Sequence, residues 1–97
     1  MPTQTRNPKD PRALRLVALR ESFDMDGPRF AAFVGLQYSR WHNFERGLPL
    51  SRAAADQLCR KIPGLTLDWL YNGNSDGMPV ALARRLGALP ADGAREA

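Results

Sequence analysis

The sequence predicts an all-α fold, a bundle of five short helices with a candidate sixth helix near the C-terminus. Apolar residues recur at spacings of three and four, which is the period of an α-helix. Glycine, proline and capping residues separate these segments at short intervals. No stretch shows the alternating pattern of a half-buried strand, and the chain has no internal repeat.

The first helix is expected to begin at Pro11, with Asp10 as its N-cap, and to end near Phe23. The residues before it, 1–11, are polar and rich in proline, which predicts a flexible arm. A second helix should follow, with Asp26 as its cap and Pro28 in its first turn, and should stop at a left-handed glycine, Gly35.

A third short helix is expected within residues 36–47, with Leu36, Trp41 and Phe44 facing inward. Ser51 should cap a fourth helix, which residues 63–64 end. The apolar positions of that fourth helix are Ala54, Ala55, Leu58, Cys59 and Ile62, where Cys59 is expected to be a small core residue.

Thr66 should cap a fifth helix of one to two turns, which Gly73 ends. Residues 74–97 are expected to be a linker, a candidate helix and a disordered tail. The leucines of residues 79–89 have little core left to join, so this segment is either a dimer-forming helix or a loose amphipathic tail. Trp69 and Tyr71 could equally belong to a subunit contact or pack onto the body of the domain.

The size of the chain excludes most enzymes. Ninety-seven residues, 43% of them hydrophobic, form one small domain, and such a chain buries only about 60–65% of its unfolded surface. A deep pocket lined by catalytic side chains is therefore not expected. No apolar run approaches the roughly 20 residues of a membrane helix.

The cysteine and histidine counts argue against disulfides and metal. Cys59 is the only cysteine and His42 the only histidine, so they cannot supply the four ligands of a zinc site. Ser39 and His42 lack a third orienting group and an oxyanion hole, so catalysis is not expected, and His42 is expected to be a surface or phosphate-facing side chain. The N-terminus lacks the apolar stretch of a secretory signal, so the protein is expected to be cytoplasmic, without a cofactor or metal.

The charge is compatible with nucleic acid. The net charge is +4, and twelve of the fourteen basic residues are arginine. Arginine suits planar, two-pronged contact with phosphate or guanine. Ribosomal and membrane-surface proteins share such a charge, so charge alone does not identify the partner.

The segment around Gly35 has a helix-turn-helix layout. Ala31 is small where two helices must approach, and Gly35 suits a turn that a side chain would oppose. Trp41 and Phe44 anchor the third helix, and Glu45 at its end could contact an arginine of the first helix. The side chains left pointing away from the core are Gln37, Tyr38, Ser39, Arg40 and Asn43.

This stretch, RFAAFVGLQYSRWHNFERG, resembles the Cro/repressor-like (XRE) helix-turn-helix family. The shared pattern has a small residue four positions before a turn glycine, an apolar residue after it, an apolar anchor, and a closing aromatic-Glu-x-Gly. Here these are Ala31, Gly35, Leu36, Trp41 and residues 44–47. The flanks LVALRESF and LTLDWLYNG are similar too, so the resemblance covers residues 12–73. It implies a five-helix repressor-like bundle that binds double-stranded DNA.

The resemblance also implies which residues touch DNA. Its base-reading positions match Gln37, Tyr38, Ser39 and Asn43, and Asn and Gln can pair with adenine through two hydrogen bonds. The expected phosphate contacts are Arg29, Arg40, Arg46 and Arg52. One departure is Gly27, which stands where the family commonly has a phosphate-binding Gln, so this contact would fall to backbone N–H groups. Trp41 is larger than the usual anchor, and residues 63–65 form a link one residue longer than is typical.

The sequence thus predicts a transcriptional regulator, not an enzyme, that represses by occupying its operator as a homodimer. Two alternatives remain open. The protein could be an antitoxin-type regulator that also binds a protein partner through its C-terminal segment. It could instead use the fold only for protein interaction, which Gly27 and the single clear cation of the third helix, Arg40, would favour. The arm with Arg6, Lys9 and Arg12 could add minor-groove contacts or be a solvated tail.

Overall fold

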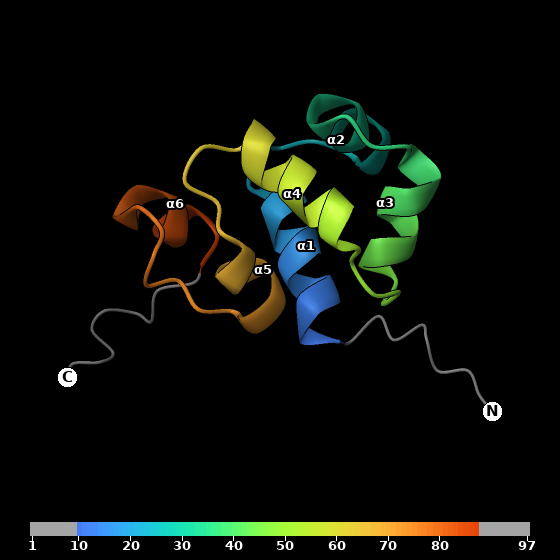
Figure 1. Ribbon diagram of the computed structural model, residues 1–97. Coiled ribbons are helices and arrows are strands. Elements are labelled where there is room, and N and C mark those ends of the chain that lie inside the picture. Colours follow the sequence, from blue (N-terminus) through green and yellow to red (C-terminus); the bar gives the residue numbers. More distant parts are fainter. Residues whose placement is uncertain (1–9, 88–97) are drawn as a thin grey trace.

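The computed structural model describes residues 10–87, and this part of the chain is all-helical (Figure 1). The predicted all-α bundle is therefore confirmed, with the candidate sixth helix present. Residues 1–9 of the predicted arm, residues 88–89 of the candidate sixth helix and the predicted tail, 90–97, lie outside the described part. The helices are α1 (Pro11–Glu21), α2 (Gly27–Val34), α3 (Tyr38–Glu45), α4 (Arg52–Lys61), α5 (Leu67–Asn72) and α6 (Val80–Arg85).

Side-chain caps begin three of these helices, as predicted. Asp10 precedes α1 without capping it through its side chain, and α1 ends two residues before the predicted Phe23. The caps are the carboxylate of Asp26, 2.9 Å from the N of Arg29, and the hydroxyls of Ser51 and Thr66, 3.2 and 3.0 Å from the N of Ala54 and Trp69.

Among residues 10–87, no helix has the length and apolar character needed to cross a membrane.

The core lies between α1 and the helices around it. Helix α1 packs against α3 and α5, and α4 packs against α2 and α5. The large ring of Trp41, fully buried, lies 4.8 Å from the ring of Phe30, centre to centre, so these two aromatics fill the space between α2 and α3. Cys59 is half-buried against this core. The largest fully buried side chains are Trp41, Phe30, Leu16, Leu19, Leu58, Ile62, Leu70 and Val34.

The segment after Gly73 differs from its prediction. Met78, Leu82 and Leu86 are buried in the same core as the first five helices, so the expectation that these leucines had little core to join is wrong. The physical reason is that α6 packs beside Phe23 and Ile62, which line one groove together with Leu82. Leu89, which the same expectation included, lies outside the described residues.

Polar contacts hold α6 to the body as well. Arg85 donates from Nε and Nη2 to the carbonyl of Ser22, at 3.1 Å each, and its guanidinium lies 4.4 Å from the centre of the Phe23 ring. Helix α6 lies at the opposite end of the molecule from α3 (Figure 1). The position of α6 therefore leaves the outer face of α3 uncovered.

Helix α5 packs onto the body, and both of its aromatics contact the rest of the domain. Trp69 is 2% exposed. Tyr71 is half-buried, and its hydroxyl donates to the carbonyl of Leu50 at 2.8 Å. Arg12 of α1 donates to the carbonyl of Tyr71 at 2.9 Å, which joins the first and fifth helices.

Candidate nucleic-acid interface

Helices α2 and α3 pack against each other and are joined by residues 35–37. Gly35 has a φ of +81°, the left-handed conformation that the sequence predicted. The N–H of Leu36 then donates to the carbonyl of Ala31 at 2.9 Å, which closes the end of α2. This turn sets the angle at which α3 leaves α2.

A side chain from α4 also stabilises the turn. Gln57 donates from Nε2 to the carbonyl of Val34 at 2.9 Å. A Cβ atom added to Gly35 would lie 2.6 Å from the same nitrogen, so the glycine is needed for space as well as for conformation. Sequence reasoning missed Gln57 because its partner is 23 residues away and no local signal marks the pair.

Two buried aromatics and one carboxylate anchor α3 to the body. Trp41 and Phe44 face inward as predicted. Glu45 accepts hydrogen bonds from Trp41 Nε1 at 2.6 Å and from Arg20 Nε at 2.7 Å. The predicted contact between Glu45 and an arginine of the first helix is therefore confirmed, and this hydrogen bond raises the pKa of Arg20. Helix α3 is thus held by α1 through both packing and charge.

The outer face of α3 carries the side chains expected to read bases. Gln37, Tyr38 and Ser39 are exposed, and Gln37 occupies the N-cap position without accepting a cap hydrogen bond. Asn43 is half-buried, so it faces partly toward the protein. The structure thus brings three of the four base-reading candidates together at the start of α3, and places the fourth one turn further along.

Tyr38 lies over the first residue of α2. A Cβ atom at Gly27 would come within 2.7 Å of Tyr38 Cε1, so the tyrosine ring occupies the space that a side chain at this position would need. The ring centres of Tyr38 and His42 are 5.6 Å apart, and the Tyr38 hydroxyl oxygen lies 3.5 Å from His42 Nδ1. The glycine that departs from the family pattern is therefore paired with a tyrosine on α3.

The N–H groups at the start of α2 have partners of their own. The side chain and the carbonyl of Asp26 accept from the N–H groups of Arg29 and Phe30, at 2.9 Å each. Pro28 has no N–H to offer. The Asp26 carboxylate therefore caps the N–H of Arg29, and the N–H of Phe30 donates to the Asp26 carbonyl in the ordinary helical pattern.

The four phosphate-contact candidates fall into two groups. Arg29 and Arg46 are exposed, and their side chains make no hydrogen bond or ion pair with any residue from 10 to 87. Arg40 donates to the Ser51 hydroxyl at 3.2 Å, so its side chain lies along α3 toward the start of α4. Arg52, the next residue, pairs with Asp56 at 3.1 Å, and both side chains are well exposed.

These contacts place the first turns of three helices near one another. Tyr38 links the start of α3 to the start of α2, and Arg40 links it to Ser51 at the start of α4. Helix N-termini carry a partial positive charge that favours phosphate. Tyr38 and Arg40 therefore connect the start of α3 to the starts of α2 and α4, whereas Asn43 and Arg46 lie further along α3.

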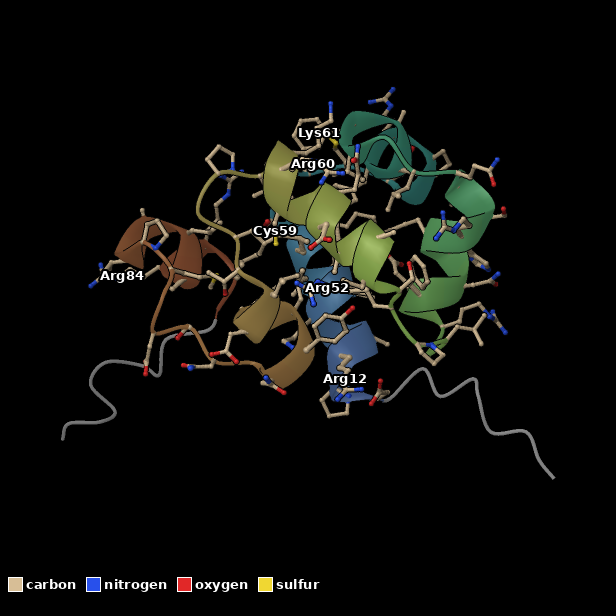
Figure 2. The ribbon with its side chains drawn as sticks, in the orientation of Figure 1. Arg12, Arg52, Cys59, Arg60, Lys61 and Arg84 are labelled. Carbon is tan, nitrogen blue, oxygen red and sulfur yellow. The ribbon has the colours of Figure 1, made fainter. Side chains whose placement is uncertain are left out.

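Other cations lie elsewhere. Arg60 and Lys61 end α4, at the opposite end of this helix from Arg52, and Arg84 projects from α6 (Figure 2). Arg60 donates to the Gln57 side chain at 2.7 Å, which orients the amide that caps α2. The positive charge is thus spread over the molecule, and α3 itself contributes only part of it.

The molecule also has an apolar groove and a half-buried thiol, that of Cys59. An apolar groove of about 350 Å³ lies beside α6, and in residues 10–87 no group of three or more potential metal ligands is present. Burial raises the pKa of the Cys59 thiol, which disfavours the reactive thiolate. The groove is lined by Phe23, Ile62, Pro63, Pro79, Ala81, Leu82 and Arg85.

Comparisons of the chain with protein-family models, with curated proteins and with solved structures found no match. The function is therefore inferred from the geometry and chemistry of the α3 face.

Proposed function

We propose that the protein binds double-stranded DNA and regulates transcription by occupying an operator. The observation that carries this proposal is the exposed start of α3, with Gln37, Tyr38 and Ser39, on a helix that Trp41 and Glu45 hold firmly to the body. The major groove of B-DNA is about 12 Å wide and admits one α-helix. The resemblance of residues 29–47 to XRE-type helix-turn-helix sequences supports the same interpretation.

Within this proposal the exposed side chains divide into two roles. The amides of Gln37 and Asn43 suit adenine, and the Ser39 hydroxyl suits either kind of base. Tyr38 offers a hydroxyl, or a ring that can contact a thymine methyl group. The cations that would bind phosphates and set the position on the duplex are Arg29, Arg40, Arg46 and Arg52.

A homodimer would supply the affinity that one small domain lacks. Helix-turn-helix dimers bind half-sites about 34–36 Å apart, so the operator would be an inverted repeat. The protein would act in the cytoplasm and carry out no chemistry of its own.

Selection of duplexes from a random library, repeated at two salt concentrations, tests the proposal. We expect enrichment of an inverted repeat, with affinity that falls steeply as salt rises because bound phosphates release counterions. Recovery of no motif, with only weak and salt-labile binding, would contradict sequence-dependent recognition.

Two arginine variants test the orientation on the duplex. Arg46→Ala should weaken binding to all sequences about equally and reduce the salt slope by about one. Arg84→Ala is the matched control, because it is equally exposed but lies on α6, at the other end of the molecule from α3 (Figure 2). Equal losses from both variants would place the duplex on a different face.

A substitution of Asn43 tests whether the side chains of α3 read the base sequence. Asn43→Ala should cost about 1–3 kcal/mol on the preferred site and relax one base position. Because Asn43 is half-buried and Gln37 is exposed, Gln37→Ala is the companion variant, and urea unfolding of both variants checks that the fold is kept. An unchanged affinity and motif for both variants would remove these amides from the base-reading set.

A second candidate is a protein-interaction module, alone or in an antitoxin-type regulator. Two observations favour it. One is the apolar groove beside α6. The other is the Asp26 carboxylate at the start of α2, whose negative charge repels a phosphate at that helix end. Failure of the duplex selection, together with a stoichiometric partner bound at the groove, would support this second candidate.

A further inference from the structure

His42 lies on the same exposed stripe of α3 as Tyr38, one turn further along. The Tyr38 ring rests against Gly27, and its hydroxyl oxygen lies 3.5 Å from His42 Nδ1. Nδ1 therefore faces the tyrosine, and the other ring nitrogen, Nε2, makes no hydrogen bond within residues 10–87. The pair is placed on the face that carries the base-reading candidates.

We propose that His42 contacts DNA through Nε2, as a hydrogen-bond donor to an acceptor on the duplex. This inference rests on the proposed function. The acceptor is guanine O6 or N7, or a phosphate oxygen, which offer the same hydrogen-bond chemistry. When His42 is neutral and its Nδ1 accepts a hydrogen bond from the Tyr38 hydroxyl, the ring proton is on Nε2. When His42 is protonated, Nε2 still donates and the ring adds a positive charge.

The charged groups near His42 do not prevent its Nε2 from contacting DNA. Arg46, an exposed cation, follows one turn later on α3. Glu45 is engaged by Arg20 and Trp41, on the side of α3 that faces α1. From α2, Asp26 lies beside Gly27, where its carboxylate caps the helix. The phosphates of a bound duplex would add negative charge, so binding should be accompanied by proton uptake.

The composition of the chain allows proton uptake on DNA binding to be assigned to one side chain. His42 is the only histidine of the chain, and histidine is the side chain that ordinarily titrates between pH 5 and 8. Carboxylates ordinarily titrate near pH 4 and the α-amino group near pH 7.7–8.0. The pKa of the Cys59 thiol is raised by burial. A change in DNA affinity between pH 5.5 and 7 that His42→Gln abolishes is therefore assigned to this one histidine.

The experiment measures affinity for the selected duplex at pH 5.5 and pH 7, each over a series of salt concentrations. For the wild type we expect tighter binding at pH 5.5, by up to about fivefold over this pH range for a pKa change of one unit on binding. The salt slope should also be steeper at pH 5.5, by up to about 0.9 if the acceptor is a phosphate. His42→Gln should lose both differences.

Tyr38→Phe tests the pairing, because it removes the hydroxyl and keeps the ring over Gly27. We expect it to weaken binding more at pH 7, where the hydroxyl orients the neutral ring, than at pH 5.5. Circular dichroism should show that both variants remain folded, since Tyr38 and His42 are exposed.

The binding motif of His42→Gln distinguishes the two acceptors. Loss of preference at one guanine identifies a base contact, whereas uniformly weaker binding of all sequences identifies a phosphate. The inference is overturned if His42→Gln binds with the affinity and pH dependence of the wild type. Absence of duplex binding at every pH overturns the proposed function and this inference together.

Discussion

Glu45 joins three parts of the molecule through one carboxylate. It accepts from Arg20 of α1 and from Trp41 of its own helix, and Arg20 also donates to the carbonyl of Met25 in the α1–α2 loop, at 3.0 Å. The side chains of Arg20 and Glu45 are 19% and 16% exposed, so little water can replace a lost partner. A buried donor without an acceptor is costly.

We therefore expect Glu45→Ala to lower the free energy of unfolding by about 2–3 kcal/mol. Glu45→Gln should cost less, because its amide oxygen can still accept from Trp41. Urea denaturation measures both, with Glu21→Ala as the control. Glu21 is an exposed carboxylate of α1, and its loss should change stability by no more than about 0.5 kcal/mol. Equal effects at positions 21 and 45 would show that the ion pair contributes nothing.

Gly27 and Tyr38 form a second pair at the residue scale. A Cβ atom at position 27 would meet the Tyr38 ring at 2.7 Å, although the ring is 46% exposed and can move away. In a Tyr38→Ala background, Gly27→Ala should stabilise α2 by about 0.5–1 kcal/mol, the ordinary gain of alanine over glycine in a helix. In the wild-type background this gain should disappear.

The unfolding free energies of the two single variants and the double variant give the coupling between these residues, expected at about 1 kcal/mol. Additive effects would mean that Tyr38 does not occupy the space in front of Gly27 in solution.

At the scale of elements, the α2–α3 turn depends on both conformation and space. Gly35→Ala would place a side chain in a left-handed conformation, which costs about 1–2 kcal/mol. It would also displace Gln57 from the carbonyl of Val34, since the new Cβ would lie 2.6 Å from Gln57 Nε2. We expect the two costs to add.

Gly87 provides the matched control for Gly35. It also has a positive φ, +72°, but a Cβ atom there would meet nothing within 4 Å. Gly87→Ala should therefore show only the conformational cost, and thermal unfolding should rank Gly35→Ala as the more destabilised. In a Gln57→Ala background the difference between the two glycines should shrink. A larger loss at Gly87 would contradict this account of the turn.

At the scale of the whole molecule, the core extends to α6. Leu82 is 8% exposed and belongs to the central cluster, whereas Val80 on the same helix is 60% exposed. Leu82→Ala should cost about 2–4 kcal/mol of unfolding free energy because it leaves a cavity. Val80→Ala should change stability by no more than about 0.5 kcal/mol.

Chemical denaturation of both α6 variants measures these differences. The DNA affinity of folded Leu82→Ala should equal that of the wild type, because α6 and α3 lie at opposite ends of the molecule (Figure 1). A stability of Leu82→Ala equal to that of the wild type would place α6 outside the folded unit.

Most of the local structure was predictable from the sequence. Asp26, Ser51 and Thr66 cap the helices they precede, and Gly35 and Gly73 end helices with positive φ values. These features depend on a residue and its near neighbours, so short-range rules suffice for them. The exposure of Gln37, Tyr38 and Ser39 follows from the same local pattern, because the apolar anchors of α3 decide which side faces water.

Apart from the contact of Glu45 with an arginine of α1, the tertiary structure alone decided which distant residues meet. Gln57 reaches Val34, the Tyr38 ring covers Gly27, and Leu82 finds a place in the core. Each contact depends on how whole helices pack, and the spacing of residues within one helix does not encode that packing. The sequence by itself determined the helices, their ends and the polar face of α3. The packing of those helices determined that α6 completes the core and that Tyr38 and His42 share the face proposed for DNA.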